Sequence, residues 1–325
     1  IGEAYRRKNL PSNAISIMMA SLSENTLKQY NTTFRLWWRF CFQTGISVYE
    51  ATTEELIRFL HNIFETANLK YGSFNSHRSA LSLILEPSVT DNPILNRFMK
   101  GLSKLRPAAP RYNATWDPNS LLQYAERLPN PLTLQELSRK LVTLLCLITG
   151  HRLQTIAKIK LSNFIYGEDA IQILIADPIK TSGRNQLQPT LHIPFFKEKR
   201  FLCCASALTE YIDRISCLRH GQDTLFLSYR RPHLVASKQT LSRWVKEFLQ
   251  AAGIDTSVFK AHSTRHSSTS AALRNGIAVD VICKTAGWSQ RTATFAKFYN
   301  RPLVPPNEFA RAVCNVSHSR QADLP

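Results

Sequence analysis

A proline-rich segment at residues 106–118 divides the chain into two parts with different sequence patterns. Pro107, Pro110 and Pro118 stand in this segment among polar residues. Because proline lacks a backbone N–H and fixes φ, no regular helix or central strand is expected to run through it. We therefore predict an interdomain linker, and a chain of 325 residues is long enough for a domain on each side.

The part before the linker predicts a helical domain at 21–105, preceded by an N-terminal extension at 1–20. From Leu27 to Cys41, apolar residues recur at steps of three and four, which places them on one face of a helix. Further helices fit two ranges: 72–85, ended by Pro87, and 93–105. Two pairs with the spacing of a capping box predict helix starts: Ser21 with Glu24, and Thr52 with Glu55.

The part after the linker predicts a mixed α/β domain at 119–301 and a polar, proline-containing tail at 302–325. Two β-rich runs, at 170–176 and 187–196, flank a hairpin-like loop. The remaining patterns are helical: 119–127, 134–148 behind a Thr133–Glu136 capping box, 203–217, 238–251, and 262–299 with breaks near Gly276 and Gly287. The predicted fold class is mainly α with a small β-sheet. A weak apolar stripe in the tail suggests oligomerisation: Phe309, Val313 and Val316.

The charge of the chain indicates its partner. Lys and Arg outnumber Asp and Glu by 41 to 23, a formal net charge of +18. Such an excess of basic side chains releases counterions from a nucleic-acid backbone, so a polyanion is predicted, and a merely basic protein is the alternative. The seven cysteines form no CxxC pair and no Cys/His spacing indicates zinc, so neither a metal nor a cofactor is expected. No apolar stretch approaches the ~18 residues of a membrane span.

Six residues of the second part carry groups suited to phosphodiester chemistry: Arg152, Lys180, His262, Arg265, Trp288 and Tyr299. Two arginines can stabilise the extra negative charge of a pentavalent phosphorus transition state. Lys180 lies in the hairpin-like loop, where it can reach DNA and protonate a departing 5′ oxygen. His262 and Arg265, three residues apart on a predicted helix, project from nearly the same face.

Tyr299 is the candidate nucleophile. A phenol with a pKa of about 10 attacks poorly unless cations lower its pKa or a base removes its proton. His262 is the candidate base, because the indole N–H of Trp288 only donates hydrogen bonds. Taken singly, each of the six has an ordinary structural interpretation, such as a helix-capping arginine, a surface lysine or a core aromatic. Their combination favours metal-free cutting and rejoining of DNA.

The order of these residues resembles the tyrosine recombinases, or phage-integrase-type recombinases, over nearly the whole chain. The segments LTLQELSRKLVTLLCLITGHRLQT, FKAHSTRHSSTSAA and AGWSQRTATFAKFYNRP are similar to recombinases of eukaryotic mobile elements in the DIRS, Ngaro and Crypton groups. The resemblance implies a helical core-binding domain that clamps DNA and a catalytic domain of the DNA breaking-rejoining type. It also implies roles for the site residues: phosphate binding by Arg152, Arg265 and Trp288, general-acid catalysis by Lys180, proton transfer assisted by His262, and formation of a 3′-phosphotyrosyl bond and a free 5′-OH by Tyr299.

The chain departs from the family pattern at Thr155, where many members have an acidic residue, so other groups are expected to support Arg152. The interval from Trp288 to Tyr299 is also longer than usual. His266, next to Arg265, is expected to face elsewhere on the helix, as a helix-surface or DNA-backbone residue. The resemblance implies double-stranded DNA at element ends or target sites as the partner, a homotetramer on two sites, and a nuclear location. Two alternatives stay open: a type IB topoisomerase and a catalytically inactive, domesticated DNA-binding protein. The presence of all six residues favours an enzyme.

Overall fold

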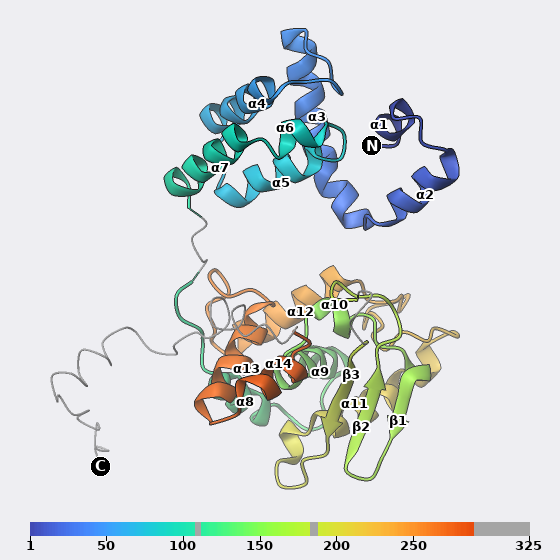
Figure 1. The fold of residues 1–325 in the computed structure, drawn as a ribbon. Helices are drawn as coiled ribbons and strands as arrows, with labels where there is room; N and C mark the ends of the chain where they lie inside the picture. Colours follow the sequence, from blue (N-terminus) through green and yellow to red (C-terminus); the bar gives the residue numbers. More distant parts are fainter. Residues whose placement is uncertain (108–111, 183–187, 289–325) are drawn as a thin grey trace, which may run out of the picture. The chain divides into compact units, whose positions relative to one another are not determined.

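The computed structural model describes residues 1–107, 112–182 and 188–288. It divides into two compact units, Ile1–Pro110 and Arg111–Pro325, each with its own core (Figure 1). No helix among the described residues combines the length and the apolar character that crossing a membrane requires.

The described part of the first unit is helical. Its helices are α1 (Gly2–Arg7), α2 (Ser12–Ala20), α3 (Glu24–Thr44), α4 (Thr53–Thr66), α5 (Tyr71–Leu81), α6 (Pro87–Thr90) and α7 (Pro93–Leu105). Its core forms where large side chains of α3, α4 and α5 meet, with Trp37, Phe59 and Phe74 fully or almost fully buried. The rings of Trp37 and Phe59 pack edge to face, with centroids 5.0 Å apart. The apolar face predicted for this region therefore supplies the core.

One predicted helix start in this unit is confirmed and one is wrong. Thr52 and Glu55 form the complete capping box of α4. Ser21 does not cap α3, because the region predicted as an extension folds into α1 and α2 and Ser21 ends α2, where its hydroxyl donates to the Met18 carbonyl (2.6 Å). Ser23 caps α3 instead, accepting the backbone N–H of Thr26 (3.1 Å).

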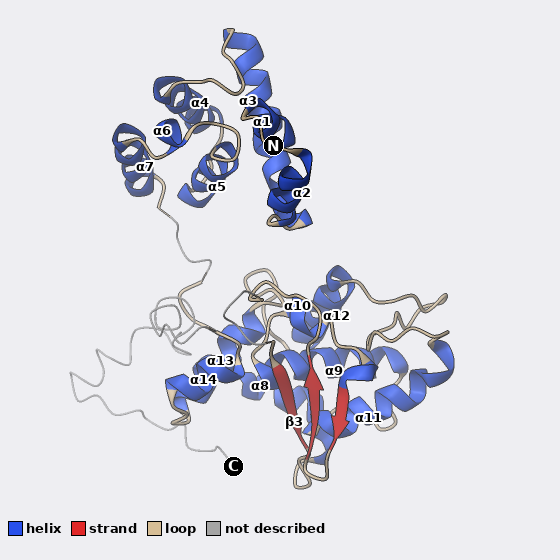
Figure 2. Ribbon diagram, turned by 45° about the vertical axis from the view of Figure 1, so that its right-hand side comes forward, coloured by secondary structure: helices blue, strands red, loops and turns tan. Residues whose placement is uncertain are grey.

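The second unit is mostly helical with one small sheet, as the predicted fold class requires. Its helices are α8 (Pro118–Glu126), α9 (Leu134–Thr149), α10 (Leu153–Ile156), α11 (Cys204–Ile215), α12 (Lys238–Ala251), α13 (Ser263–Arg274) and α14 (Val279–Thr285). Strands β1 (Phe164–Tyr166), β2 (Ala170–Leu174) and β3 (Thr190–Pro194) form an antiparallel sheet in the order β1-β2-β3. Ile171 lies opposite Ile193 in the register of β2 and β3, and both are buried. The sheet lies beside α9 and α11, with β3 nearest to them (Figure 2).

Helix α9 runs through the centre of the second unit. It packs against α11, α12 and α13, so its side chains are buried nearly all round. The predicted Thr133–Glu136 capping box starts the helix, and Gly150 ends it in the left-handed conformation, with φ +59°. This sharp stop turns the chain out of the core directly before Arg152.

The two ends of the segment 106–118 are held by different units. The Arg106 guanidinium donates to backbone carbonyls of Ala67 and Phe64 in the first unit. In the second unit Trp116 is buried, and its indole N–H donates to the Ser263 hydroxyl (2.8 Å). Its carbonyl accepts a hydrogen bond from the Ser267 hydroxyl (2.9 Å), so Trp116 is fastened to the first turns of α13.

Candidate phosphate-binding site

Arg265 is buried at the point where three segments of the second unit meet. Its side chain is 0% exposed, although it carries a charge. Its Nη1 donates to the carbonyl of Ala286 (2.8 Å) and to the carbonyl of Gly150, which closes the end of α9. Hydrogen bonds from a charged donor are stronger than neutral ones, so Arg265 ties the turn after α14 to the turn after α9.

Trp288 lies against Arg265. The guanidinium carbon of Arg265 stands 4.0 Å from the centroid of the Trp288 ring, the arrangement of a cation–π contact. The Trp288 backbone N–H donates to the Cys283 carbonyl (2.9 Å), which holds the residue close to α14. Two of the six predicted residues are thus brought into direct contact by segments far apart in sequence.

Arg152 directly precedes α10 and is only partly buried, so its guanidinium is more accessible than that of Arg265. Its backbone carbonyl accepts the N–H of Thr155 (2.8 Å), a buried residue. Thr155 stands where many members of the family have an acidic side chain, and this bond belongs to the first turn of α10. The positive charges of Arg152 and Arg265 both act on His262, which places the two guanidinium groups around one site.

His262 directly precedes α13 and keeps contact with solvent. Partial burial, and then the charges of Arg265, Arg152, Lys180 and Lys238, lower the pKa of His262 to about 4. The imidazole is therefore neutral near pH 7 and able to accept a proton. Its ring packs edge to face on His266, with centroids 5.4 Å apart. His262 and His266 are four residues apart and therefore share one side of the helix. His266 in turn packs against the ring of Tyr112.

The two remaining predicted residues differ in what the structure describes of them. Lys180 is exposed in the turn that follows β2, close enough to His262 for its charge to lower the histidine pKa. Tyr299 lies outside the described residues, as do the tail and its apolar stripe of Phe309, Val313 and Val316.

His151, which no sequence motif singled out, lies next to Arg152 and Gly287 within this site. Its side chain is buried, with 5% exposed, and it hydrogen-bonds to the backbone of Thr285. Burial, and then the charges of Arg265 and Arg152, lower the pKa of His151 to about 4, against the opposite effect of the Thr285 bond. The ring packs against Gly287, the residue before Trp288. The sequence feature that could have pointed to His151 is its position between Gly150, which ends α9, and Arg152.

Lowering the pH from 6.5 to 4 is expected to reduce the free energy of unfolding through His151. The folded pKa is about 4 and the unfolded value 6.5, so in this window the unfolded chain binds more protons. The contribution of neutral His151 to the free energy of unfolding is complete above the unfolded pKa and is lost as the pH falls toward the folded pKa. The loss amounts to about 3 kcal/mol at most. Urea unfolding at several pH values measures it. His151→Leu should weaken the pH dependence, and an undiminished dependence in that variant contradicts the assignment.

Gly287→Ala is expected to lower the free energy of unfolding by about 2–4 kcal/mol. Gly287 has φ +64°, and a Cβ there would stand 2.6 Å from the His151 Cε1 atom. Gly253→Ala is the matched control, because its φ is +80° but its Cβ would meet nothing within 4 Å. Chemical denaturation should show the larger loss at Gly287, and adding His151→Ala should cost less than the sum of the two single changes. Equal losses at the two glycines would disprove the close contact.

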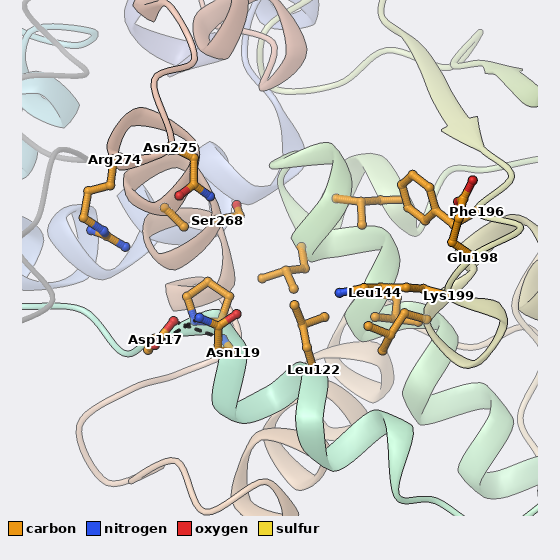
Figure 3. Close-up of a pocket in the computed structure, with 15 residues that line it drawn as sticks. Asp117, Asn119, Leu122, Leu144, Phe196, Glu198, Lys199, Ser268, Arg274 and Asn275 are labelled. Atoms are coloured by element: carbon orange, nitrogen blue, oxygen red, sulfur yellow. Dashed lines mark hydrogen bonds between the residues drawn. The ribbon is translucent and has the colours of Figure 1, made fainter. Parts of the chain in front are cut away.

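A separate cavity of about 540 Å³ lies between α8, α9 and α13 (Figure 3). Its lining is largely apolar and includes Leu122, Leu144 and Phe196. At its edge the Asp117 carboxylate accepts hydrogen bonds from the backbone N–H of Asn119 (3.0 Å) and from its side-chain amide (3.4 Å). The described residues of the candidate site do not line this cavity, so it is a distinct feature of the unit.

Within the described ranges, no three His, Cys, Asp or Glu side chains are grouped so that they could hold a metal ion. The groups that the structure assembles are cationic and imidazole side chains around Arg265. Such a cluster is suited to binding an oxyanion and to moving a proton next to it.

Comparisons with known proteins give the family of the chain and proteins of similar fold. Residues 117–303 match the model of the phage integrase family. A lambda integrase dimer bound to a COC′ core site has a similar fold, with a TM-score of 0.51 and 18% identity over 89% of this chain and 75% of that one. The XerH site-specific recombinase bound to a palindromic difH substrate gives a TM-score of 0.57 and 16% identity over 82% of this chain and 72% of that one. No curated protein matches the chain significantly.

Proposed function

Because the chain belongs to the phage integrase family, we propose that it recombines DNA at specific sites by breaking and rejoining strands through Tyr299. The observation that carries the proposal is the joining of Arg265, Trp288 and the Arg152 turn through the carbonyls of Gly150 and Ala286. This arrangement brings two arginines and an indole from three separate segments to one place. A phosphodiester is the oxyanion that the basic chain is best suited to meet.

The cleavage step assigns one task to each group. The Tyr299 phenol oxygen attacks the scissile phosphorus, and its proton passes to the neutral imidazole of His262. The bond from phosphorus to the 5′ oxygen breaks, and the Lys180 ammonium protonates that leaving oxygen. Arg152 and the indole N–H of Trp288 bind the phosphate oxygens, and Arg265 adds its charge and holds both turns in place.

The rejoining step reverses the first one. A free 5′-hydroxyl attacks the phosphorus of the 3′-phosphotyrosyl group and gives its proton back to Lys180. The bond from phosphorus to the Tyr299 oxygen breaks, and His262 returns the proton to that oxygen. The covalent intermediate keeps the bond energy of the broken phosphodiester, so rejoining requires no nucleotide. When the attacking hydroxyl belongs to a second duplex, the outcome is strand exchange.

The wider role of the protein is proposed from its motifs. Their similarity to recombinases of the DIRS, Ngaro and Crypton groups supports mobilisation of a eukaryotic element, action on element ends or target sites, and a nuclear location. Strand exchange between two duplexes supports a homotetramer on two DNA sites. The excess of basic residues supports tight binding to both duplexes.

A nicked suicide duplex tests the proposal directly. Cleavage next to the nick releases a short fragment, and the protein should remain attached to the DNA after denaturation. The adduct should carry a free 5′-OH, and peptide mass spectrometry should place the nucleotide on Tyr299. Relaxation of supercoiled DNA without strand exchange would point to a topoisomerase. Binding without an adduct on any tested element-end duplex would point to a DNA-binding protein and overturn the proposal.

A further inference from the structure

Helix α3 is aromatic on two opposite sides. One side supplies Trp37 and Phe40 to the core of the first unit. On the other side Trp38 and Phe42 are 60% and 85% exposed. Exposed large apolar groups that stand together usually mark a binding surface. Together with the basic residues beside them they form a surface that we name the aromatic–basic face: Lys28, Arg35, Trp38, Arg39 and Phe42.

The charges of the aromatic–basic face have one sign. Lys28, Arg35 and Arg39 are all exposed, and from residue 25 to residue 44 helix α3 contains no acidic residue. The ion pairs formed within the described ranges do not include these three cations. A partner with dense negative charge therefore fits the face.

The spacing of the two exposed rings suits nucleobases. Trp38 and Phe42 are four residues apart, so they stand on one side of the helix with a rise of about 6 Å between them. One base stacked between two rings holds the rings roughly 7 Å apart, twice the ~3.4 Å spacing of stacked bases. Guanidinium groups beside aromatic rings form the combination that binds single-stranded nucleic acid, with cations on the phosphates and rings on the bases.

We propose that the aromatic–basic face of α3 binds DNA whose bases are unpaired, by stacking Trp38 and Phe42 on them. In an intact duplex neighbouring bases cover each other, so rings of this kind reach a base only after it has unstacked. The inference deepens the proposed function, because strand exchange between two duplexes leaves bases unpaired until the new strands anneal. A second copy of the chain is a poorer occupant, since a symmetric contact would bring two sets of like charges together.

The test uses the full chain and two short oligonucleotides of equal length. One is oligothymidylate, and the other is an abasic strand that keeps the phosphates but has no bases. The double variant Trp38→Ala/Phe42→Ala should bind oligothymidylate about ten- to a hundred-fold more weakly in fluorescence anisotropy, with unchanged affinity for the abasic strand. Phe201→Ala, which removes a 53% exposed ring from the second unit, is the matched control and should change neither affinity.

Three outcomes would overturn the inference. The double variant could keep its affinity for oligothymidylate, or it could lose affinity equally for both strands, which would assign the face to backbone contacts alone. It could also change the sedimentation of the free protein without changing DNA affinity, which would make the face a protein interface. Both side chains are exposed, so the variant should fold, and its thermal unfolding checks this. Binding of a free oligonucleotide involves no cleavage, so this test can fail or succeed independently of the suicide-duplex assay.

Discussion

Tyr299→Phe is expected to abolish the covalent protein–DNA adduct and to leave DNA binding unchanged. Phenylalanine keeps the ring but lacks the oxygen that forms the bond to phosphorus. Another side chain would need both a nucleophilic atom and the same approach to the phosphate to replace it. With a suicide duplex, the variant should give no denaturant-resistant complex, while gel-shift affinity for the same duplex stays at the level of the unchanged chain.

Tyr166→Phe is the control for this loss. Tyr166 is 63% exposed in β1, so losing its hydroxyl should affect neither stability nor adduct formation. An adduct that persists in Tyr299→Phe, or one that disappears in Tyr166→Phe, would show that another residue is the nucleophile and would contradict the proposed mechanism.

Arg265→Met is expected to reduce the rate of adduct formation by roughly a thousand-fold and the free energy of unfolding by about 3 kcal/mol. Methionine is close in length and apolar, but it leaves the buried carbonyls of Gly150 and Ala286 without their charged donor. It also removes the cation from the face of the Trp288 ring. The kinetic loss should exceed what unfolding explains, because the variant still populates the folded state.

Single-turnover cleavage and urea unfolding measure the two effects separately. Arg274→Met lies on the same helix, but Arg274 is exposed, so this control should retain nearly full activity and stability. Arg265→Lys keeps the charge but not the planar fork of donors, and it should recover part of the stability and little of the rate. Full activity in Arg265→Met would show that Arg265 is not needed for cleavage and does not belong to the functional site.

Much of the fold follows from local sequence signals. Helices α7 and α12 begin and end at the predicted residues, and the Thr52 and Thr133 boxes start α4 and α9 as expected. The misses have physical causes. Strand β1 has three residues, too few to show a period, and it exists because β2 pairs with it. The predicted start of α3 was displaced because Ser21 and Ser23 both offer a capping hydroxyl, and only the end of α2 decides between them.

The sequence predicted a set of six candidate residues but not the contacts among those that the structure describes. Order along the chain was enough to single out the six side chains, since each carries a group that phosphoryl transfer needs. The contacts of Arg265 with two backbone carbonyls were beyond prediction, because they depend on where the turns after α9 and α14 meet. The same holds for His151 and His266, whose importance comes from neighbours in space and not from any motif.

The attachment of Trp116 gives the second unit a mechanical anchor. Its indole holds Ser263 and its carbonyl holds Ser267, on either side of Arg265 in sequence. The chain directly before α8 is therefore fastened to the first turns of α13. Since Arg265 lies between the two serines, a change at Trp116 should be felt first at the turn of α13 that carries this buried guanidinium.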